Sequence, residues 1–355
     1  MKTTKKQQLG FSLVELMIAS LMGLILTYSV LQIYLAQTQL YKASNSQDLI
    51  QSNENAISNL LIPLIRSAGF VGCGSIATSI SNLNAGGPKP IGDINTSPTM
   101  MIGYNGSGGS FTITQSNAPN SSNANNWTPA LDASLVGNAQ QGSDVIVMLG
   151  PTPDSFPVGI STIDSGSSFL VIQNATGLTL TAGQFAAVSD CGKSIVFQIS
   201  GVAGTNISHN AGAGVSSNSS STFPINFQVG AQLVPLQQTA LFIGQGQGGQ
   251  SALMIATLNG NAWNIQPLVP GVEFMKIQYG VGVNGVINQY VSANAVTNWA
   301  NVYSVRVGLL ISGQRGSGSL TTQQYQVLDT QVTTPNDNRL RHVYELTVTL
   351  RNSVS

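Results

Sequence analysis

The chain has 355 residues, of which 42% are hydrophobic and only 7% are charged. The high apolar fraction excludes a chain kept disordered by charge, and the length allows one large domain or two ordinary ones. Its 13 basic residues equal its 13 acidic ones, which argues against binding nucleic acid through charge, and its 2 His and 2 Cys leave little material for an enzyme or a metal site.

The N-terminal segment has the pattern of a membrane anchor. Lys2, Lys5 and Lys6 lie in the first ten residues, and no charged residue occurs from Leu16 to Tyr41. This apolar run is long enough for one transmembrane helix, which we expect at about residues 13–35. Because the lysines precede the run, we expect the N-terminus in the cytoplasm and the rest of the chain outside it.

One acid, Glu15, lies at the start of this apolar run. A carboxylate inside a membrane helix costs about 2.5–3.5 kcal/mol on insertion scales, so we expect it to have a positively charged partner. Cleavage after Gly10 would keep the anchor and create a new amine on Phe11. That amine and Glu15 are four residues apart on one helix, and they are equally able to pair between neighbouring helices.

The segment Gly10–Ser20, GFSLVELMIAS, resembles the class III signal of type IV pilins and pseudopilins. The resemblance implies that residues 1–10 are a leader peptide, cut between Gly10 and Phe11 by prepilin peptidase, and that the Phe11 amine is methylated. It also implies that Glu15 pairs with the amine of a neighbouring subunit during filament assembly. The alternative is a plain single-span anchor whose Glu15 lies near the lipid headgroups.

The helix is expected to continue beyond the membrane, so that residues 11–68 form one long helix. Pro63 removes a backbone hydrogen bond, and we therefore expect a kink or an early end near Ile62, with Gly69 as the more favoured stop. Apolar residues at helical spacing predict a stripe that packs on a globular domain. The stripe consists of Ile50, Ile57, Leu61, Leu64 and Ala68.

Residues 69–355 contain many strand-like runs separated by polar loops, which predicts an α+β fold with a β-rich antiparallel head. The loops expected are the region 75–127, rich in Ser, Asn and Gly, and the segments Gly201–Ser221 and Gly244–Gln250. The strand-like runs are Met100–Tyr104, Ser110–Thr114, Asp144–Leu149, Phe169–Gln173, Gln184–Val188, Ser194–Ile199, Phe227–Leu236, Ala240–Ile243, Ala252–Leu258, Val272–Tyr279, Tyr303–Ile311 and His342–Arg351.

Side-chain alternation assigns faces to two of these runs. Apolar residues alternate with Arg306 and Gly308 in 305–309, and with polar residues in 344–351, which predicts two half-buried strands. We interpret Tyr279 and Trp299 as core residues rather than as a sugar-stacking site.

The two cysteines, Cys73 and Cys191, are both expected outside the cytoplasm, where oxidising conditions favour a disulfide between them. The alternative is a reactive thiol. His209 and His342 lack a nucleophile in a recognisable motif, and GQGQGGQ (Gly244–Gln250) lacks the Lys-Ser/Thr of a phosphate loop. We therefore predict no catalytic residue, metal or cofactor. Scattered acids are interpreted as surface or turn residues, namely Asp132, Asp144, Asp154, Asp164 and Asp190.

Five segments of the head resemble the PilW family of minor pilins. They are SAGFVGCG (67–74), SDCGKSIVFQIS (189–200), LVPGVEFMKIQYGV (268–281), VYSVRVGLLISG (302–313) and RLRHVYELTVTLRN (339–352). The resemblance implies the type IV pilin fold and a non-enzymatic role in starting pilus assembly and forming the tip complex. It implies as partners other minor pilins, the major pilin, prepilin peptidase, the inner-membrane assembly platform and a PilC/PilY-type tip protein. The expected location is the bacterial inner membrane, and then the pilus tip.

Two other functions stay open from the sequence. A J-type pseudopilin of type II secretion shares the signal and the helix. A pilus-tip adhesin would use the Asn/Ser/Gly loops of 75–127 or 203–221 to bind a host glycan or a surface.

Overall fold

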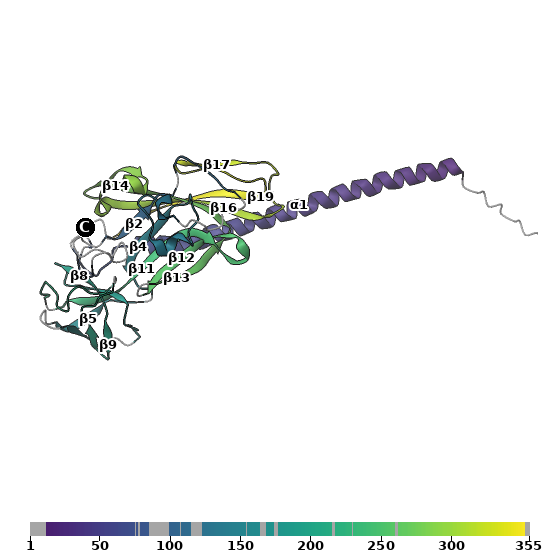
Figure 1. The fold of residues 1–355 in the computed structure, drawn as a ribbon. Helices are drawn as coiled ribbons and strands as arrows, with labels where there is room; N and C mark the ends of the chain where they lie inside the picture. The colour runs from purple at the N-terminus through teal and green to yellow at the C-terminus, as the bar shows by residue number, and fades with distance from the viewer. Residues whose placement is uncertain are drawn as a thin grey trace, which may run out of the picture.

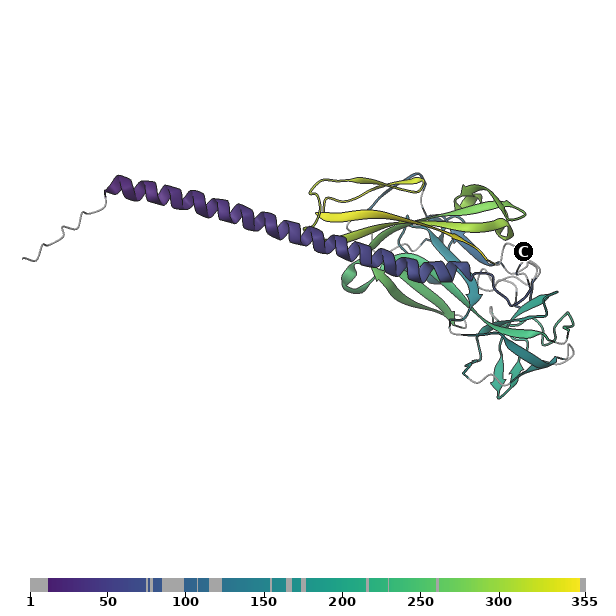
Figure 2. The ribbon, with the colours of Figure 1, turned by 180° about the vertical axis from the view of Figure 1, so that it is seen from behind.

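A long N-terminal helix projects from a β-rich head in the computed structural model of this chain (Figure 1). The structure describes residues 12–351 except 75, 77–78, 85–98, 107, 115–122, 154, 164–167, 174–176, 215–216, 229 and 260–261. The helix, α1, spans Leu13–Arg66 and has 54 residues. Its C-terminal end lies in the head, and its N-terminal half extends beyond it (Figure 2). The predicted fold class is therefore confirmed.

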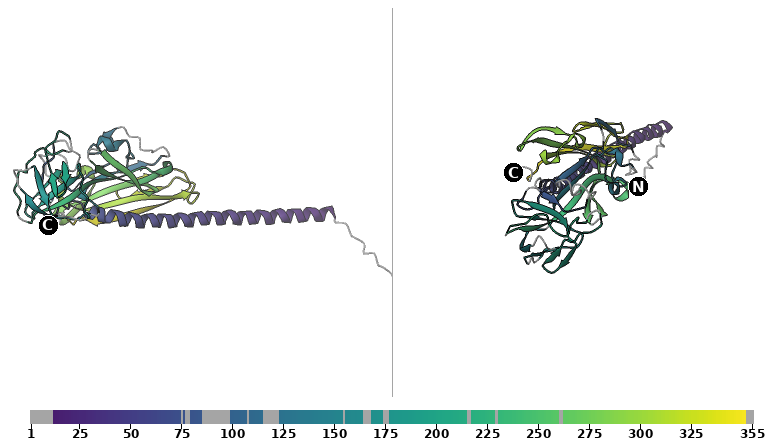
Figure 3. Two further views of the ribbon diagram at one scale, coloured as in Figure 1. Left: turned by 90° about the horizontal axis from the view of Figure 1, so that it is seen from below. Right: turned by 60° about the vertical axis from the view of Figure 1, so that its left-hand side comes forward.

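The buried face of α1 follows the helical repeat. Ser46, Ile50, Asn53, Ile57, Leu61 and Ile65 are buried at spacings of three and four residues. This confirms the predicted stripe at Ile50, Ile57 and Leu61, and Ala68, just past the end of the helix, is fully buried as well. Leu64 is only partly buried, and the adjacent Ile65 occupies the core. The head lies along one side of this part of α1, as the left view of Figure 3 shows.

The expected early end near Ile62 is wrong, because α1 continues through Pro63 to Arg66. Pro63 lies close to the end of the helix, where its missing N–H leaves few later turns to disturb. The flanking Leu61 and Ile65 are both fully buried, and this packing holds the last turn. The chain then turns at Gly69, whose φ of +78° favours glycine and whose N–H donates to the carbonyl of Leu149 at 2.7 Å.

The described strands form three sheets. A 12-stranded sheet has the order β1-β8-β7-β11-β5-β6-β10-β9, with β4 and β12 also paired to β11, β2 paired to β4, and β13 paired to β12. Its members are β1 (Ser79–Ser81), β2 (Met101–Tyr104), β4 (Val145–Pro151), β5 (Val158–Ile163), β6 (Phe169–Ile172), β7 (Phe185–Ser189), β8 (Ser194–Gln198), β9 (Gly201–Ala203), β10 (Asn206–Ser208), β11 (Gln232–Gln245), β12 (Ser251–Asn259) and β13 (Ala262–Pro270). Most pairs are antiparallel, as predicted, although β1 pairs with β8 in parallel.

Two smaller sheets complete the head. The four-stranded sheet has the order β15-β14-β16-β19, and the three-stranded sheet has the order β17-β18-β3. Their members are β3 (Ser110–Thr112), β14 (Val272–Val283), β15 (Val286–Val291), β16 (Val302–Arg315), β17 (Gln324–Val327), β18 (Thr330–Thr333) and β19 (Arg339–Thr349). A short helix, α2 (Ala133–Val136), precedes β4.

Two sequence expectations about strands need correction. The segment Gly201–Ser221 was expected as a loop, but it contains the β9–β10 hairpin. The runs 227–236 and 240–243 were expected as two strands, but residues 232–245 form one long strand, β11. This strand stays continuous because β7 pairs with its first part, and β4 and β12 pair with its later part.

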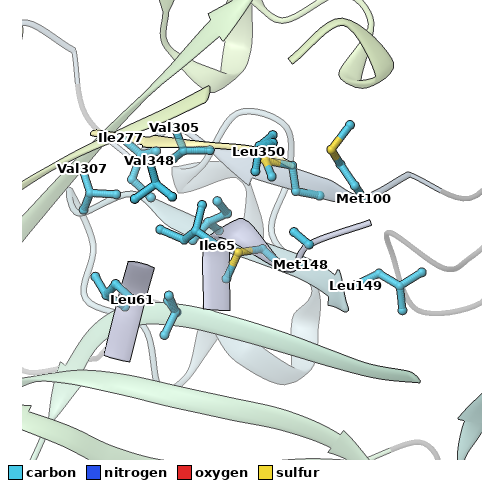
Figure 4. Packing of buried hydrophobic residues seen from close by; sticks show 14 of the residues in the cluster. Leu61, Ile65, Met100, Met148, Leu149, Ile277, Val305, Val307, Val348 and Leu350 are labelled. Atoms are coloured by element: carbon cyan, nitrogen blue, oxygen red, sulfur yellow. The ribbon is translucent and has the colours of Figure 1, made fainter. Parts of the chain in front are cut away.

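The largest core cluster joins α1 to the 12-stranded and four-stranded sheets (Figure 4). Leu61 and Ile65 of α1 contribute to it, as do Met148 of β4 and Ile277 of β14. Burial of such side chains stabilises the fold by roughly 25 cal/mol for each Å² of apolar surface removed from water. The end of the helix is therefore at the centre of the fold.

The expected half-burial of residues 305–309 is wrong, because β16 is buried on both faces. Its second face is covered by the three-stranded sheet, where Leu310 packs with Val327 and Val332. The strand β19 is half-buried as predicted, since Leu346 and Val348 are buried and Thr347 between them is exposed. Tyr279 is fully buried and meets Trp299 edge to face at 4.8 Å, which confirms their place in the core.

A separate cluster fills the lobe built on β5–β10, farthest from the exposed end of α1 (Figure 1). His209 lies in this lobe, 1% exposed, and its ring stacks on Phe223 with the centroids 4.0 Å apart. Its Nδ1 atom has no hydrogen-bond partner among the residues described. Burial lowers the pKa of His209 to about 4, because the uncharged ring is the form that tolerates these surroundings.

The stripe on α1 can be tested with a matched pair of substitutions. Ile57→Ala is expected to lower the free energy of unfolding by about 2–5 kcal/mol, because Ile57 is fully buried. Leu60→Ala, on the same turn but 43% exposed, should cost less than about 1 kcal/mol. Denaturant unfolding of the full chain in detergent measures both, and equal losses would contradict the assigned buried face.

His209 should make stability depend on pH. Below its usual pKa of about 6.5 the unfolded chain binds a proton that the folded chain refuses until about pH 4, so acid favours unfolding. Stability should therefore fall as the pH drops through this window, by roughly 2 kcal/mol from this group. His209→Phe keeps the ring stack and should flatten the difference; unfolding curves of the two chains that stay parallel with pH would disprove this origin.

Candidate functional site

The N-terminal half of α1 is a continuous exposed apolar surface. From Leu13 to Tyr41 its large apolar side chains are between 46% and 74% exposed. An 18-residue window on this helix has a mean hydropathy of 1.9, and none of that window is buried in the head. By length and composition this helix can cross a membrane, and its exposed surface is the strongest candidate for a functional site.

Hydroxyl groups on this half of the helix are bonded to its own backbone. Ser20 Oγ donates to the carbonyl of Met17 at 2.9 Å, and Thr27 Oγ1 donates to that of Gly23 at 2.7 Å. Ser29 Oγ donates in the same way to the carbonyl of Ile25 at 2.9 Å. A polar group in hydrocarbon needs such an internal partner, so these residues do not prevent the helix from entering a lipid bilayer.

Glu15 lies in the first turn of α1, and its backbone N–H donates to the carbonyl of Ser12 at 3.0 Å. An acid is stabilised near a helix N-terminus by the helix dipole. It is the one charged residue on α1 before Lys42, so it breaks an otherwise uncharged surface. The predicted cleavage and methylation residues Gly10 and Phe11 lie outside the described residues, and their roles remain predictions.

Polar contacts fix the other half of α1 in the head. The side chain of Asn53 donates from Nδ2 to the carbonyl of Pro270 at 3.0 Å, and Ser46 Oγ accepts from the N–H of Gln314 at 3.1 Å. Both Asn53 and Ser46 belong to the buried stripe. These bonds set the rotation and the depth of α1 in the head, so the exposed half is presented in one orientation.

A second pair of contacts joins α1 to β19. His342 Nδ1 lies 2.6 Å from Glu54 Oε1, and the hydroxyls of Ser58 and Tyr344 are hydrogen-bonded. The sequence predicts no catalytic role for His342. The structure places it at the contact between helix and head.

The disulfide between Cys73 and Cys191 is present, as predicted. It joins the segment that follows α1 to the turn between β7 and β8. Asp190 holds this turn, because its carboxylate accepts N–H bonds from Gly192 and Lys193 at 3.2 and 3.1 Å. The disulfide therefore connects the end of the helix to the part of the head that is distant from the anchor.

The interpretation of the scattered acids is correct for two residues. Asp190 is the turn residue just described, and Asp132 caps α2 by accepting from the N–H of Ser134 at 2.9 Å. Asp154 and Asp164 lie outside the described residues.

Asp144 is neither a surface nor a turn residue, so that part of the prediction is wrong. Its side chain is 2% exposed and its Oδ1 lies 3.5 Å from Nζ of Lys276. The N–H groups of Gly106 and Ile277 each donate to its carboxylate at 2.9 Å. Burial raises the pKa of Asp144 to about 6, although Lys276 acts in the opposite direction.

A cleft of about 710 Å³ lies beside α1 and the turn between β11 and β12. Two carboxylates line it, Glu273 and Asp337, and both are bound by Arg341 at 2.6 and 2.7 Å. Because the guanidinium engages both carboxylates, they are poorly placed for acid–base chemistry. Over the described ranges, no three His, Cys, Asp or Glu residues form a group that could hold a metal ion.

Comparison with known proteins identifies the C-terminal part of the chain. Residues 240–352 match the PilW family, described as type IV pilus-assembly protein W. This confirms the predicted resemblance over that segment. A solved structure of a type IV-like pilin from Thermus thermophilus is 23% identical and covers 34% of this chain and 70% of its own, but its TM-score of 0.24 carries no argument. No curated protein matches the chain.

The matched segment coincides with the strands that hold α1. It includes β13, β16 and β19, the strands that contact the helix most extensively. The lobe of β5–β10 lies outside the matched segment, as do residues 67–74 and 189–200, which contain the two cysteines. The family resemblance therefore concerns the part of the head that positions the exposed helix.

Proposed function

We propose that this chain is a minor pilin of a type IV pilus, a non-enzymatic component of filament assembly. One observation carries the proposal: the segment that matches a pilus-assembly family contains the strands that contact α1 most extensively, and α1 leaves free for membrane and helix contacts an apolar half whose one charged residue is Glu15. Such a surface is stable in a bilayer or against other apolar helices, and it is costly in water.

Before assembly, the protein would be a single-pass protein of the inner membrane with its N-terminus in the cytoplasm. In this proposal residues 1–10 are removed after Gly10, the Phe11 amine is methylated, and residues 11–68 form the long helix with its membrane part at about 13–35. Residues 69–355 then form the periplasmic or extracellular head. Lys2, Lys5 and Lys6 support this orientation.

During assembly, Glu15 would pair with the Phe11 amine of a neighbouring subunit. An unpaired carboxylate costs about 2.5–3.5 kcal/mol in a membrane helix, so the pair forms most favourably where the apolar helices of two subunits align. This alignment sets the axial register between the helices. The hydroxyls of Ser20 and Thr27 already have partners within α1. The Glu15 carboxylate is therefore the one charged group on the membrane half that needs a partner from another subunit.

The partners proposed are other minor pilins, the major pilin, prepilin peptidase and the inner-membrane assembly platform, with a PilC/PilY-type protein at the tip. The chain would act in starting the pilus and in forming its tip complex. The lobe of β5–β10 enlarges the head on the side away from the anchor (Figure 1). This extra bulk supports a position at the end of the filament.

Deletion of the gene tests this function against its rivals. Loss of surface pili with normal protein secretion is the expected outcome, and the full-length gene should restore piliation. Blocked release of secreted proteins with normal pili would instead indicate a J-type pseudopilin. Normal pili with lost adherence would indicate a tip adhesin.

The role of Glu15 has its own test. Glu15→Gln removes the charge but keeps the shape, and we expect normal processing with at least about a tenfold loss of incorporation into filaments, which corresponds to about 1.4 kcal/mol. Asp48→Asn is the matched control, since Asp48 is an exposed acid on the same helix outside the expected membrane part. Immunoblots of sheared pili and of membranes measure incorporation and processing, and equal incorporation of both variants would refute the pairing.

A further inference from the structure

Three polar side chains meet between the 12-stranded and the four-stranded sheets of the head. Lys276 of β14 donates from Nζ to Oδ1 of Asn105, which follows β2, at 2.5 Å. The same Nζ lies 3.5 Å from Oδ1 of Asp144, which precedes β4. Lys276 and Asp144 have side chains that are only 2% exposed, and Asn105 is partly buried. An amine, a carboxamide and a carboxyl group are thus held in contact, away from bulk water.

The surroundings of this group are apolar and rigid. Tyr104, Trp127 and Tyr279 are buried around it, at 2%, 2% and 0% exposure. The ring N–H of Trp127 donates to the carbonyl of Ser143 at 2.9 Å, and the hydroxyl of Tyr279 has no partner within the described part of the chain. Such a site favours reactions that would not proceed in water, because it excludes solvent and fixes the reacting groups.

The backbone of Asn105 is fixed as well. Its N–H and its carbonyl both bond to Thr128 at 2.9 Å. The next residue, Gly106, allows close approach, because a Cβ there would lie 2.3 Å from the carbonyl oxygen of Ser143. The carboxamide of Asn105 is therefore presented to Lys276 by a constrained turn.

The carboxyl group of Asp144 is suited to acid–base work. Burial raises its pKa to about 6, so it can both accept and return a proton near neutral pH. Its two oxygens are oriented by the N–H groups of Gly106 and Ile277. A neighbouring carboxyl group that accepts the amine proton converts the lysine into a nucleophile.

We propose that Lys276 and Asn105 form an intramolecular isopeptide bond, with Asp144 as its acid–base group. The Lys276 ammonium first gives a proton to the Asp144 carboxylate. The Nζ lone pair then attacks Cγ of Asn105, and Oδ1 takes the proton from Asp144. The carboxylate next removes a proton from Nζ and passes it to Nδ2.

The bond between Cγ and Nδ2 then breaks, ammonia leaves, and Oδ1 returns its proton to Asp144 as the carbonyl re-forms. The products are a Cγ–Nζ amide, one ammonia molecule and protonated Asp144. The atoms and charges of the starting ammonium, carboxylate and carboxamide are conserved, and no oxidant or other reactant is needed.

This bond would connect two sheets that share no strand pairing. Asn105 follows β2 of the 12-stranded sheet, and Lys276 belongs to β14 of the four-stranded sheet, whose members β16 and β19 contact α1. The bond would join positions 171 residues apart in the sequence. The inference goes beyond the proposed function and does not depend on it.

The direct test is the intact mass of the full chain, purified in detergent with its disulfide kept. We expect the mass to be lower than the sequence mass, corrected for processing and the disulfide, by one ammonia molecule. A protease digest should then contain a branched peptide that includes residues 105 and 276. A chain of full mass after prolonged incubation in the folded state would overturn the proposal.

Loss of ammonia has a competing source, because Asn105 is followed by Gly106 and such a pair can form a cyclic succinimide. Lys276→Arg distinguishes the isopeptide bond from the succinimide, because it keeps the positive charge but removes the attacking amine. If the isopeptide bond is the source of the ammonia loss, this variant should have its full mass. Persistence of the ammonia loss in this variant, or an unbranched peptide in the wild type, would assign the loss to succinimide and overturn the proposal.

The role of Asp144 is tested by Asp144→Asn and Asp144→Glu. A carboxamide neither accepts nor releases a proton near neutral pH, so the fraction of cross-linked chain should fall at least tenfold, and the glutamate should restore part of it. Far-ultraviolet circular dichroism shows whether each variant is folded. If Asp144→Asn does not fold, the time course of ammonia loss in the wild type supplies the test: faster bond formation at pH 6 than at pH 4 is expected, and a pH-independent rate would refute the acid–base role.

Discussion

The packing of one helical stripe determines how the rest of this protein is arranged. A single helix serves two environments, because its backbone bonds are satisfied internally except at its ends and at Pro63. Side chains alone decide which half enters lipid and which half enters the head. The buried stripe ends in Leu61 and Ile65, where strands from the 12-stranded and four-stranded sheets converge. If this stripe lost its contacts, the head would keep no defined orientation to the exposed apolar half, and the proposed pairing of Glu15 would no longer determine the position of the head.

The polar residues in the stripe add direction to this packing. Apolar contacts are tolerant of small rotations, whereas the bonds from Asn53 to the carbonyl of Pro270 and from Gln314 to Ser46 exist at one rotation and depth. Each contributes only about 1 kcal/mol net, so their effect is on geometry more than on stability. The match of residues 240–352 to a pilus-assembly family falls on the strands that make these contacts. The segment that matches the family is therefore also the part of this chain that contacts the helix most extensively.

Features that depend on neighbours in the sequence could be predicted, and features that depend on distant partners could not. The exposed half of α1 and the stripe follow from local patterns, as does the half-burial of β19. Gly10 and Phe11 were proposed from a motif alone. The burial of Asp144 was missed because its partner Lys276 is distant in sequence, and because an acid that begins a strand-like run gives no local sign of burial. The double burial of β16 was missed for a similar reason, since its cover is made of β17, β18 and β3, which are strands of only three or four residues.

Covalent links are most useful where hydrogen-bonded sheets are interrupted. Within a sheet, force is shared among many backbone bonds, but in the described chain no strand of the 12-stranded sheet pairs with a strand of the four-stranded sheet. The bonds between these sheets are scattered, such as the one from the N–H of Asp144 to the carbonyl of Met275 at 2.9 Å. The disulfide Cys73–Cys191 already joins the end of α1 to the distal hairpin. A Lys276–Asn105 bond would close the second interruption, between the four-stranded sheet and the 12-stranded sheet that carries the distal lobe. A subunit pulled at its head while its helix is held in a filament is loaded across both interruptions, so the two links would act on the same path of force.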